Sequence, residues 1–117
     1  MPRSILVVDD SSIMREALVA VLVNRGYEVF QASDGNAAIA KARQNPVDLL
    51  ITDLVMPEQE GIETIKHFVQ EFPEMPIIAM SGKIEYLPMA KALGAAAVLK
   101  KPFAHADLLN AVRDLIG

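Results

Sequence analysis

The sequence places acidic, hydroxyl and lysine side chains directly after its short apolar segments. In chain order these residues are Asp9, Asp10, Asp53, Ser81, Lys100 and Lys101. Carboxylates held close together repel one another, and protonation or a bound cation relieves the repulsion. Oxygen ligands without histidine or cysteine select a hard ion such as Mg²⁺. Because a lysine and a serine hydroxyl suit anionic phosphoryl oxygens, the set as a whole predicts phosphoryl chemistry.

Asp53 is the residue of this set that we predict to accept a phosphoryl group. It stands alone after the apolar segment 49–51. A carboxylate is a known covalent acceptor of phosphoryl groups, and a metal ion and a lysine such as Lys101 offset the charge that develops. Taken singly, Asp10, Ser11 or Ser12 could cap the first helix, Ser81 could be a turn residue and Lys101 a surface lysine. The conjunction of these side chains is what indicates a site.

Short apolar segments that alternate with segments of helical period predict a parallel sheet. Three of them are almost wholly apolar, as expected for interior strands covered on both faces, namely Ile5–Val8, Leu49–Ile51 and Ile77–Met80. The segment 27–32 is interrupted by Glu28 and Gln31, and the segment 96–99 is short and rich in alanine. These last two segments are therefore predicted to flank the sheet.

Apolar residues at helical spacing predict one helix after each strand. The predicted helical stripes cover residues 13–22, 38–42, 62–72, about 87 onward and 108–116. Gly26, Pro46 and Pro73 mark the ends of the first three helices. Pro88 suits only a first helical turn, so it delays the fourth helix to about Leu87 and leaves a longer loop after the fourth strand.

This alternation predicts an α/β fold with a doubly wound sheet, formed by residues 1–117 as one domain. With residues 27–32 at an edge, we expect five parallel strands in the order 2-1-3-4-5, which is known from flavodoxin-like folds. In such sheets ligands bind outside the carboxyl ends of the strands, between strands one and three. The polar residues that follow the strands would then converge on one crevice.

The composition fits one globular domain and excludes several classes of protein. The chain has 117 residues, of which 52% are hydrophobic and 22% charged. Its longest apolar runs fall far short of a membrane span and no signal peptide is apparent, so we expect a soluble protein that stays in the cytoplasm. With no cysteine and two separate histidines, thiolate and histidine metal sites are disfavoured. The net charge of −4 argues against nucleic-acid binding.

Four motifs stand at the ends of the predicted strands. They are Ile-Leu-Val-Val-Asp-Asp at 5–10, Asp-Leu-Val-Met-Pro at 53–57, Met-Ser-Gly at 80–82 and Lys-Lys-Pro-Phe at 100–103. With them, the whole chain resembles the receiver domains of bacterial two-component response regulators, in particular the single-domain, CheY-like type. The resemblance implies a CheY-like fold and a regulatory phosphoacceptor, not an enzyme that acts on a separate substrate.

The resemblance also implies a phosphoacceptor and a metal site. Asp53 would take a phosphoryl group from the phosphohistidine of a sensor histidine kinase or a phosphotransfer protein. Mg²⁺ would be held by Asp10, Asp53 and the backbone carbonyl of Val55, and Asp9 would act mainly through a water bound to the metal. The protein would catalyse only its own phosphorylation and dephosphorylation.

Two further residues and a surface receive roles from the resemblance. Ser81 would hydrogen-bond the phosphoryl group and drive a conformational switch, and Lys101 would pair with Asp53 or its phosphoryl group. The peptide between Lys101 and Pro102 would be cis. A downstream protein would read the face made by the fourth helix, the fifth strand and the fifth helix. Because no DNA-binding segment follows Gly117 in the sequence, we expect a protein target or onward phosphotransfer, without DNA or membrane binding, unless the chain is a piece of a longer protein.

The sequence departs from the receiver pattern near the site. Val98 stands where a tyrosine or phenylalanine is usual, and Gly82 stands where alanine is usual, which would loosen the loop. Lys83 and Val55 occupy two positions that tune phosphoryl lifetime, and neither side chain can orient an attacking water. We therefore expect switching to run through the loop 81–87 and little through a side-chain flip at position 98.

Several other residues are expected to have ordinary structural roles. His67 and His105 lack metal-ligand spacing and are predicted to lie on the surface. Pro57 and Gly61 are predicted to be turn residues. A solvated acidic loop is expected from three glutamates, Glu58, Glu60 and Glu63.

Three other functions compete with a regulatory phosphoacceptor. A Mg²⁺-dependent phosphohydrolase with an aspartyl nucleophile is the alternative that we retain, although its two acids after the first strand would be spaced by one residue, whereas Asp9 and Asp10 are adjacent. A flavodoxin-like nucleotide binder is disfavoured because neither G-x-G-x-x-G nor G-x-x-x-x-G-K-[ST] occurs. A receiver domain used only for docking is disfavoured because every phosphorylation position is filled.

Overall fold

Strands and helices follow one another in regular alternation, as the sequence predicts. The computed structural model describes residues 2–54 and 60–117. The strands are β1 (Ser4–Val8), β2 (Glu28–Ala32), β3 (Leu49–Asp53), β4 (Ile77–Ser81) and β5 (Ala97–Lys100). The α-helices are α1 (Ser12–Asn24), α2 (Gly35–Gln44), α3 (Glu60–Glu71), α4 (Leu87–Leu93) and α5 (His105–Ile116). A short 3₁₀ helix, η2 (Ile84–Tyr86), precedes α4.

The five strands form one parallel sheet in the order β2-β1-β3-β4-β5, which confirms the predicted order. Every residue of β1, β3 and β4 is buried, whereas β2 and β5 contain half-buried and exposed residues. The apolar segments were therefore interior strands and the interrupted segments were edges, because only an interior strand is covered on both faces.

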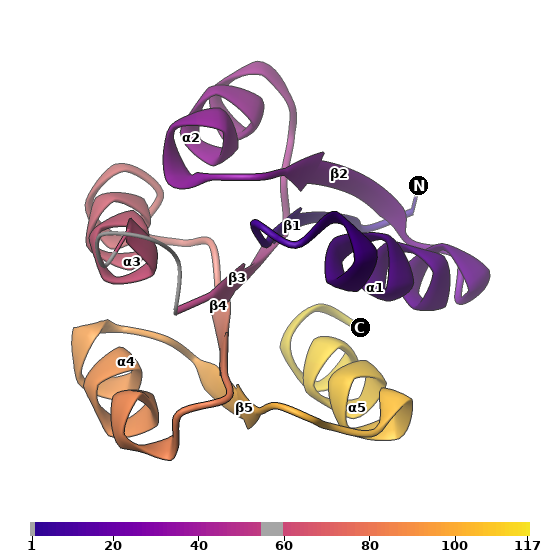
Figure 1. Cartoon of the computed structure of the whole chain (residues 1–117). Helices are drawn as coiled ribbons and strands as arrows, with labels where there is room; N and C mark the ends of the chain where they lie inside the picture. Colours follow the sequence, from indigo (N-terminus) through magenta and orange to yellow (C-terminus); the bar gives the residue numbers. More distant parts are fainter. Residues whose placement is uncertain (1, 55–59) are drawn as a thin grey trace.

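The sheet separates two layers of helices (Figure 1), and with them two apolar clusters. On one side α1 and α5 cover the sheet, with Leu18, Leu22 and Leu108 buried against alternate strand residues. On the other side α2, α3 and α4 cover it, with Ile65 and Phe68 of α3 fully buried. Successive strand residues point to opposite faces, so each interior strand contributes to both clusters.

Local sequence signals account for several helix ends. The Ser11 side chain accepts a hydrogen bond from the main-chain N–H of Met14 and caps α1, and Asp34 caps α2 in the same way. After α1 the chain turns at Gly26, whose φ of 93° is a left-handed conformation that favours glycine. Pro88 lies in the first turn of α4, as predicted. The structure differs from the prediction in placing η2 within the expected loop before α4.

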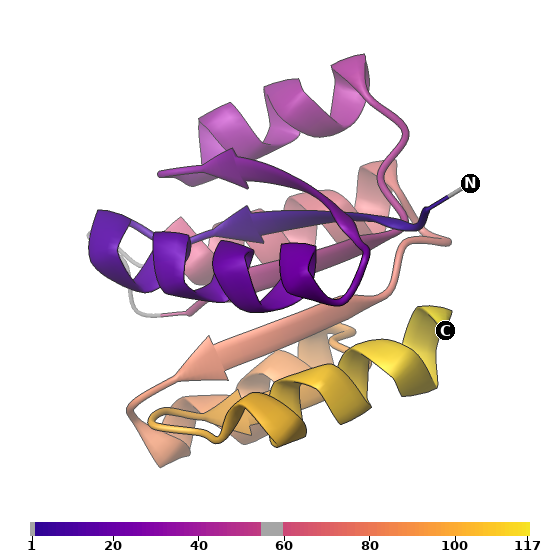
Figure 2. The ribbon, with the colours of Figure 1, turned by 90° about the vertical axis from the view of Figure 1, so that its right-hand side faces the viewer.

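The carboxyl ends of the strands lie at one end of the molecule. Figure 2 shows the strand arrows pointing to the same side, with α1 and α5 in front of the sheet. Three strands extend at their carboxyl ends beyond the predicted segments, so that β3 ends at Asp53, β4 at Ser81 and β5 at Lys100. Among the described residues, no helix combines the length and the apolar character needed to cross a bilayer.

Candidate functional site

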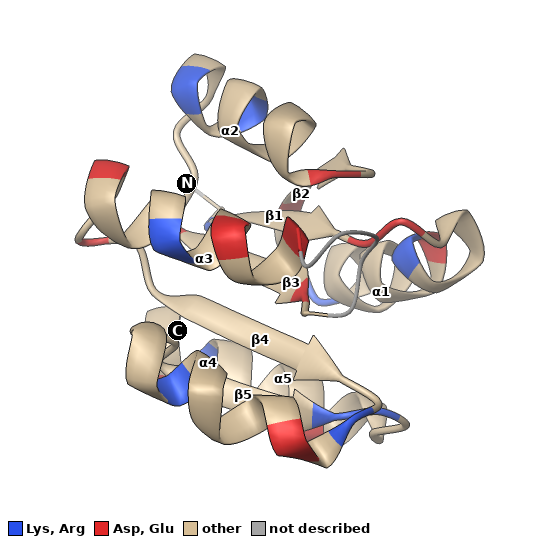
Figure 3. Cartoon of the chain, turned by 60° about the vertical axis from the view of Figure 1, so that its left-hand side comes forward, with Lys and Arg blue, Asp and Glu red and all other residues tan. Residues whose placement is uncertain are grey.

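Carboxylates from two adjacent strands meet at this end of the sheet. Asp9 and Asp10 directly follow β1, and Asp53 is the last residue of β3. One carboxylate oxygen of each residue lies within 4.8 Å of the others. Asp9 and Asp53 are buried, while Asp10 is exposed. Figure 3 shows the acidic segments after β1 and β3, and a basic segment at the end of β5, on the same side of the molecule.

Lys101 bridges the two buried carboxylates. Its Nζ donates to Oδ2 of Asp53 at 2.9 Å and to Oδ2 of Asp9 at 3.1 Å. The lysine side chain is only 17% exposed. The three carboxylates and this ammonium group together carry a formal charge of −2, which is the charge that one divalent cation neutralises.

Two opposing effects act on the pKa of Lys101. Burial lowers the pKa of the ammonium group, because a less polar environment disfavours the charged form. The hydrogen bond and charge of Asp53, followed by those of Asp9, raise the pKa and outweigh the burial, so that it lies above its ordinary value. Lys101 is therefore a fixed positive charge at neutral pH.

The two acids after β1 differ in their surroundings. Both carboxylate oxygens of Asp9 accept hydrogen bonds, one from the main-chain N–H of Ser11 at 2.9 Å and the other from Lys101. The main-chain oxygen of Asp9 accepts from Nη1 of Arg15 at 2.7 Å, and Arg15 also donates to Gln31 at 3.2 Å. Asp9 is thus held from three sides, while Asp10 faces solvent.

Ser81 lies at the end of β4 and is fully buried. Its hydroxyl oxygen accepts the main-chain N–H of Lys83 at 2.9 Å. Its main-chain oxygen accepts the N–H of Lys101 at 2.8 Å. The serine is consequently linked both to the loop that follows it and to the lysine that contacts Asp53.

The positions where the sequence departs from the receiver pattern lie around these residues. Val98 is half-buried on β5 and packs against the cluster beneath α2, α3 and α4. Lys83 is exposed, and its Nζ lies 5.9 Å from the centre of the Tyr86 ring. Gly82 has no positive φ and open space where a Cβ would stand, so its backbone is one that other residues also adopt. Val55, the expected carbonyl ligand of the metal, lies outside the described residues.

The structure gives Lys101–Pro102 as a cis peptide, as the resemblance implies. The structure brings together Asp9, Asp53 and Lys101 through hydrogen bonds from the lysine ammonium group, with Asp10 in the same group of carboxylates. Ser81 lies close to them because β4 pairs with β3, and because its main-chain oxygen accepts the N–H of Lys101. These side chains are therefore brought together from segments that are far apart in the sequence.

The prediction of a solvated acidic loop was wrong for Glu60 and Glu63. Both belong to the first turn of α3, and Glu60 is half-buried because its carboxylate accepts the main-chain N–H of Gly35 at 2.5 Å. The prediction of a turn residue was also wrong for Gly61, which is a buried helical residue. Glu58 and Pro57 lie outside the described residues. Both histidines lie on helices, with His105 exposed and His67 partly exposed beside Glu71.

Arg15, Glu60 and Gly61 are the site-related residues that the sequence analysis missed. Each makes its contact with a segment that is distant in the sequence or with the main chain, so no motif within one segment identified it. A usable signal was present only for Gly61, since glycine within a helical stripe costs stability and often has a packing reason.

Comparison with known proteins supplies the family. The family model for the response regulator receiver domain matches residues 5–113. The chain is 34% identical over 116 residues to the response regulator receiver protein CpdR of Brucella abortus, and the match covers 97% of each chain. It spans about half the length of several other curated relatives, which are transcriptional regulators.

Solved structures agree with this assignment. The chemotaxis response regulator CheY4 of Vibrio cholerae has a TM-score of 0.90 at 32% identity, with 99% of this chain and 100% of that chain covered. The response regulator TrrA of Thermotoga maritima, solved in complex with Mg²⁺ and BeF, has a TM-score of 0.89 at 30% identity, with 97% and 99% covered. The chain belongs to the receiver domains of two-component response regulators. This family acts in signalling and not as metabolic enzymes.

Proposed function

We propose that Asp53 accepts a phosphoryl group from the phosphohistidine of a sensor histidine kinase or a phosphotransfer protein. The observation that carries this proposal is the contact of Lys101 with Asp53 at 2.9 Å, inside a group of three carboxylates at the carboxyl end of the sheet. A buried carboxylate beside a fixed positive charge is a suitable covalent acceptor for a phosphoryl group. The family of the chain supports the same assignment.

Mg²⁺ is the cofactor that fits the residues present. The donors are carboxylate oxygens, without nitrogen or sulfur ligands. The three carboxylates and Lys101 carry a formal charge of −2, which one divalent cation would balance. Asp10 and Asp53 would hold the ion directly, and Asp9, whose oxygens already accept hydrogen bonds, would act through a water. The carbonyl of Val55 remains a predicted ligand. When bound, the ion offsets the negative charge between the acceptor and the incoming phosphoryl group.

The side chains of the site can be assigned to steps of the transfer. A carboxylate oxygen of Asp53 forms a bond to phosphorus while the bond from phosphorus to the imidazole nitrogen of the donor breaks. The imidazole keeps the electron pair of that bond and takes a proton from water. Lys101 orients the carboxylate beforehand and then offsets the charge of the bound phosphoryl group. The protein thus catalyses its own phosphorylation.

Ser81 is the residue that we assign to the switch. A serine hydroxyl can donate one hydrogen bond while it accepts another, so Ser81 can donate to a phosphoryl oxygen and still accept from Lys83. Movement of its hydroxyl toward the phosphoryl group would therefore carry the main chain of Lys83 with it. Because η2 begins directly after Lys83, the displacement would reach the start of α4.

The face formed by α4, β5 and α5 is the surface that we assign to a downstream protein. A groove between β5 and α5 carries both apolar and charged residues, among them Val98, Phe103, Lys100 and Asp107. Phosphorylation adds about −1.5 to −2 charge at the site, next to the end of β5. A partner whose contacts avoid residues 86–95 and 101–107 altogether would contradict this assignment. We assign residues 1–117 to a single receiver domain and expect it in the cytoplasm.

The test is uptake of one phosphoryl group from a small-molecule phosphodonor, measured by intact mass. Wild type in Mg²⁺ is expected to gain the mass of one phosphoryl group, whereas Asp53→Asn and wild type in chelator are expected to gain none. Uptake in chelator, or a phosphoryl group on Asp9 or Asp10, would overturn the assignment. The retained alternative, a phosphohydrolase, predicts instead turnover of many donor molecules per protein.

A further inference from the structure

The first turn of α3 rests directly on the backbone of the phosphoacceptor strand. A Cβ atom at Gly61 would lie 2.5 Å from the main-chain oxygens of both Asp53 and Leu54, and 2.6 Å from the Cα of Leu54. Gly61 is not among the glycines with positive φ, so the position requires the absence of a side chain and not a special backbone conformation. Any larger residue must move either α3 or the end of β3.

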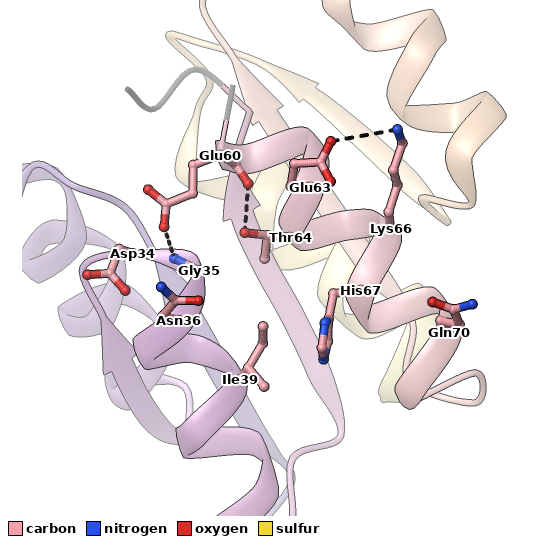
Figure 4. Close-up of a pocket in the computed structure, with 10 residues that line it drawn as sticks. All are labelled: Asp34, Gly35, Asn36, Ile39, Glu60, Glu63, Thr64, Lys66, His67 and Gln70. Carbon is pink, nitrogen blue, oxygen red and sulfur yellow. Dashed lines mark hydrogen bonds and ion pairs between the residues drawn. The ribbon is translucent and has the colours of Figure 1, made fainter. Parts of the chain in front are cut away.

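Glu60, the residue before it, ties the same turn to α2. Its carboxylate reaches across from α3 and accepts the main-chain N–H of Gly35, the first residue of α2, at 2.5 Å (Figure 4). The hydroxyl of Thr64 donates to the main-chain oxygen of Glu60 at 2.8 Å, and a Cβ at Gly35 would overlap that hydroxyl. The two helices therefore approach each other through hydrogen bonds and through the missing side chain of Gly35.

The remainder of α3 has little freedom to move away. Ile65 and Phe68 of this helix are fully buried in the cluster that it shares with α2 and α4. On the opposite side, the main-chain N–H of Leu54 donates to Met80 of β4 at 2.8 Å. The main chain of Asp53 and Leu54 thus lies between β4 and the first turn of α3, and both neighbours are anchored.

We propose that Glu60 and Gly61 are positioning residues for phosphoryl transfer to Asp53. Glu60 holds the first turn of α3 against α2 through its hydrogen bond to Gly35. Because Gly61 has no side chain, the same turn can lie directly against the main chain of Asp53 and so fix the position of the acceptor carboxylate. This inference rests on the proposed function of Asp53. Ordinary van der Waals contact for a Cβ atom begins at 3.4 Å, so a methyl group at Gly61 requires a displacement of about 1 Å from 2.5 Å. A misplacement of about 1 Å in a reacting group costs roughly 10²-fold in rate.

The first test is Gly61→Ala in the full chain, with Mg²⁺ and a small-molecule phosphodonor, at a temperature where circular dichroism shows every variant folded. We expect the rate of phosphoryl uptake at Asp53 to fall by roughly 100-fold. The matched control is Val112→Ala, which removes core contacts of α5 on the other side of the sheet without adding an atom beside Asp53, and which should keep the wild-type rate. Equal losses in both variants would mean that general destabilisation is responsible, and would overturn the proposal.

The second test separates the hydrogen bond of Glu60 from its charge. Glu60→Gln keeps an oxygen that accepts the N–H of Gly35, so its rate should stay close to that of wild type, whereas Glu60→Ala should be slower. Glu63→Ala removes an exposed carboxylate from the same turn and should leave the rate unchanged. If Glu60→Gln were as slow as Glu60→Ala, the carboxylate would act through its charge and the positioning role would be wrong.

The outcomes distinguish this inference from the proposed function. If wild type takes up no phosphoryl group in Mg²⁺, the proposed function fails. If wild type is phosphorylated at Asp53 and Gly61→Ala reacts within about twofold of the same rate, only the positioning role fails.

Discussion

The hydroxyl oxygen of Ser81 accepts the main-chain N–H of Lys83 at 2.9 Å, so the side chain at the end of β4 is already tied to the loop that follows. A displacement of the serine hydroxyl would therefore also displace the main chain of the loop before α4.

Ser81→Ala is predicted to accept a phosphoryl group at Asp53 but to lose most of the backbone response. A charge-assisted hydrogen bond contributes ~1.5–3 kcal/mol, which shifts a two-state equilibrium by about tenfold or more. Amide NMR shifts measured with a phosphoryl mimic test this. Val98→Ala should keep the response, because valine offers no pair of inward and outward states of similar energy. An unchanged response in Ser81→Ala, or a lost response in Val98→Ala, would contradict a loop-driven switch.

Asp10→Asn is predicted to weaken Mg²⁺ binding more than Asp9→Asn does. Asp10 is exposed, whereas both oxygens of Asp9 already accept hydrogen bonds from Ser11 and Lys101. Even residues that only support metal ligands are worth about 10–100-fold in metal affinity, so we expect a loss of at least about tenfold for Asp10→Asn. Calorimetric titration with Mg²⁺ measures it, with Asp114→Asn on the exposed side of α5 as the control. The reverse order of the two losses would refute the assignment of direct ligands.

Lys101→Met is predicted to separate metal binding from phosphoryl transfer. Removing the ammonium group leaves three carboxylates without their positive neighbour, so Mg²⁺ should bind at least as tightly as it does to wild type. The rate of phosphoryl uptake should nevertheless fall by about 10²–10³-fold, the usual cost of losing one group that stabilises developing charge. Titration and intact mass give the two quantities. A variant that loses metal affinity and rate in parallel would show that Lys101 acts only by holding the site together.

Glu71→Gln is predicted to remove a pH-dependent contribution to stability from the α2–α3 side of the molecule. The hydrogen bond from Arg43, and then that from His67, lower the pKa of the Glu71 carboxyl from 4.5 to about 2. Because the folded-state pKa is depressed, the stabilisation is present above pH 4.5 and is lost as the pH falls toward about 2. The contribution is small, since the ion pair lies on the surface.

Urea unfolding of wild type and Glu71→Gln, at neutral pH and at a pH of about 2, measures this difference. The two proteins should differ at neutral pH and converge in acid, and added salt should reduce the difference at neutral pH. Glu74→Gln, another exposed glutamate, is the control and should show no such convergence. A difference that persists unchanged in acid would contradict the role of the ion pairs.

The sheet could be predicted because its signals are local. The apolar segments 5–8, 49–51 and 77–80 became the interior strands, and each strand carried its polar residue at the expected end. The exact strand ends were less predictable, since Asp53 and Ser81 continue the ladder through main-chain pairing that their side chains do not indicate. The same locality explains why Ser11 was among the three candidates for the cap of the first helix, and why Pro88 was assigned correctly to the first turn of the fourth.

The contacts between helices could not be predicted in the same way. The sequence around Glu60 resembles that of a solvated loop. Only the packing of α3 beside α2 brings the Glu60 carboxylate to Gly35. Arg15 lies in α1 with no motif around it, yet it holds the main chain of Asp9. Such contacts depend on how the elements cross in space, and patterns read along a single sequence do not reveal that crossing.

The division of the core by the sheet makes this molecule suitable for independent engineering of its two halves. Leu22 and Leu108 lie in a different apolar cluster from Ile65 and Phe68, and the sheet separates the two clusters. A combinatorial library confined to the half that contains only α1 and α5 can therefore be selected for heat resistance, while α3, the helix beside Asp53, keeps its native packing. The opposite half offers the complementary experiment, in which the reaction rate is varied while the packing of α1 and α5 on the sheet stays unchanged.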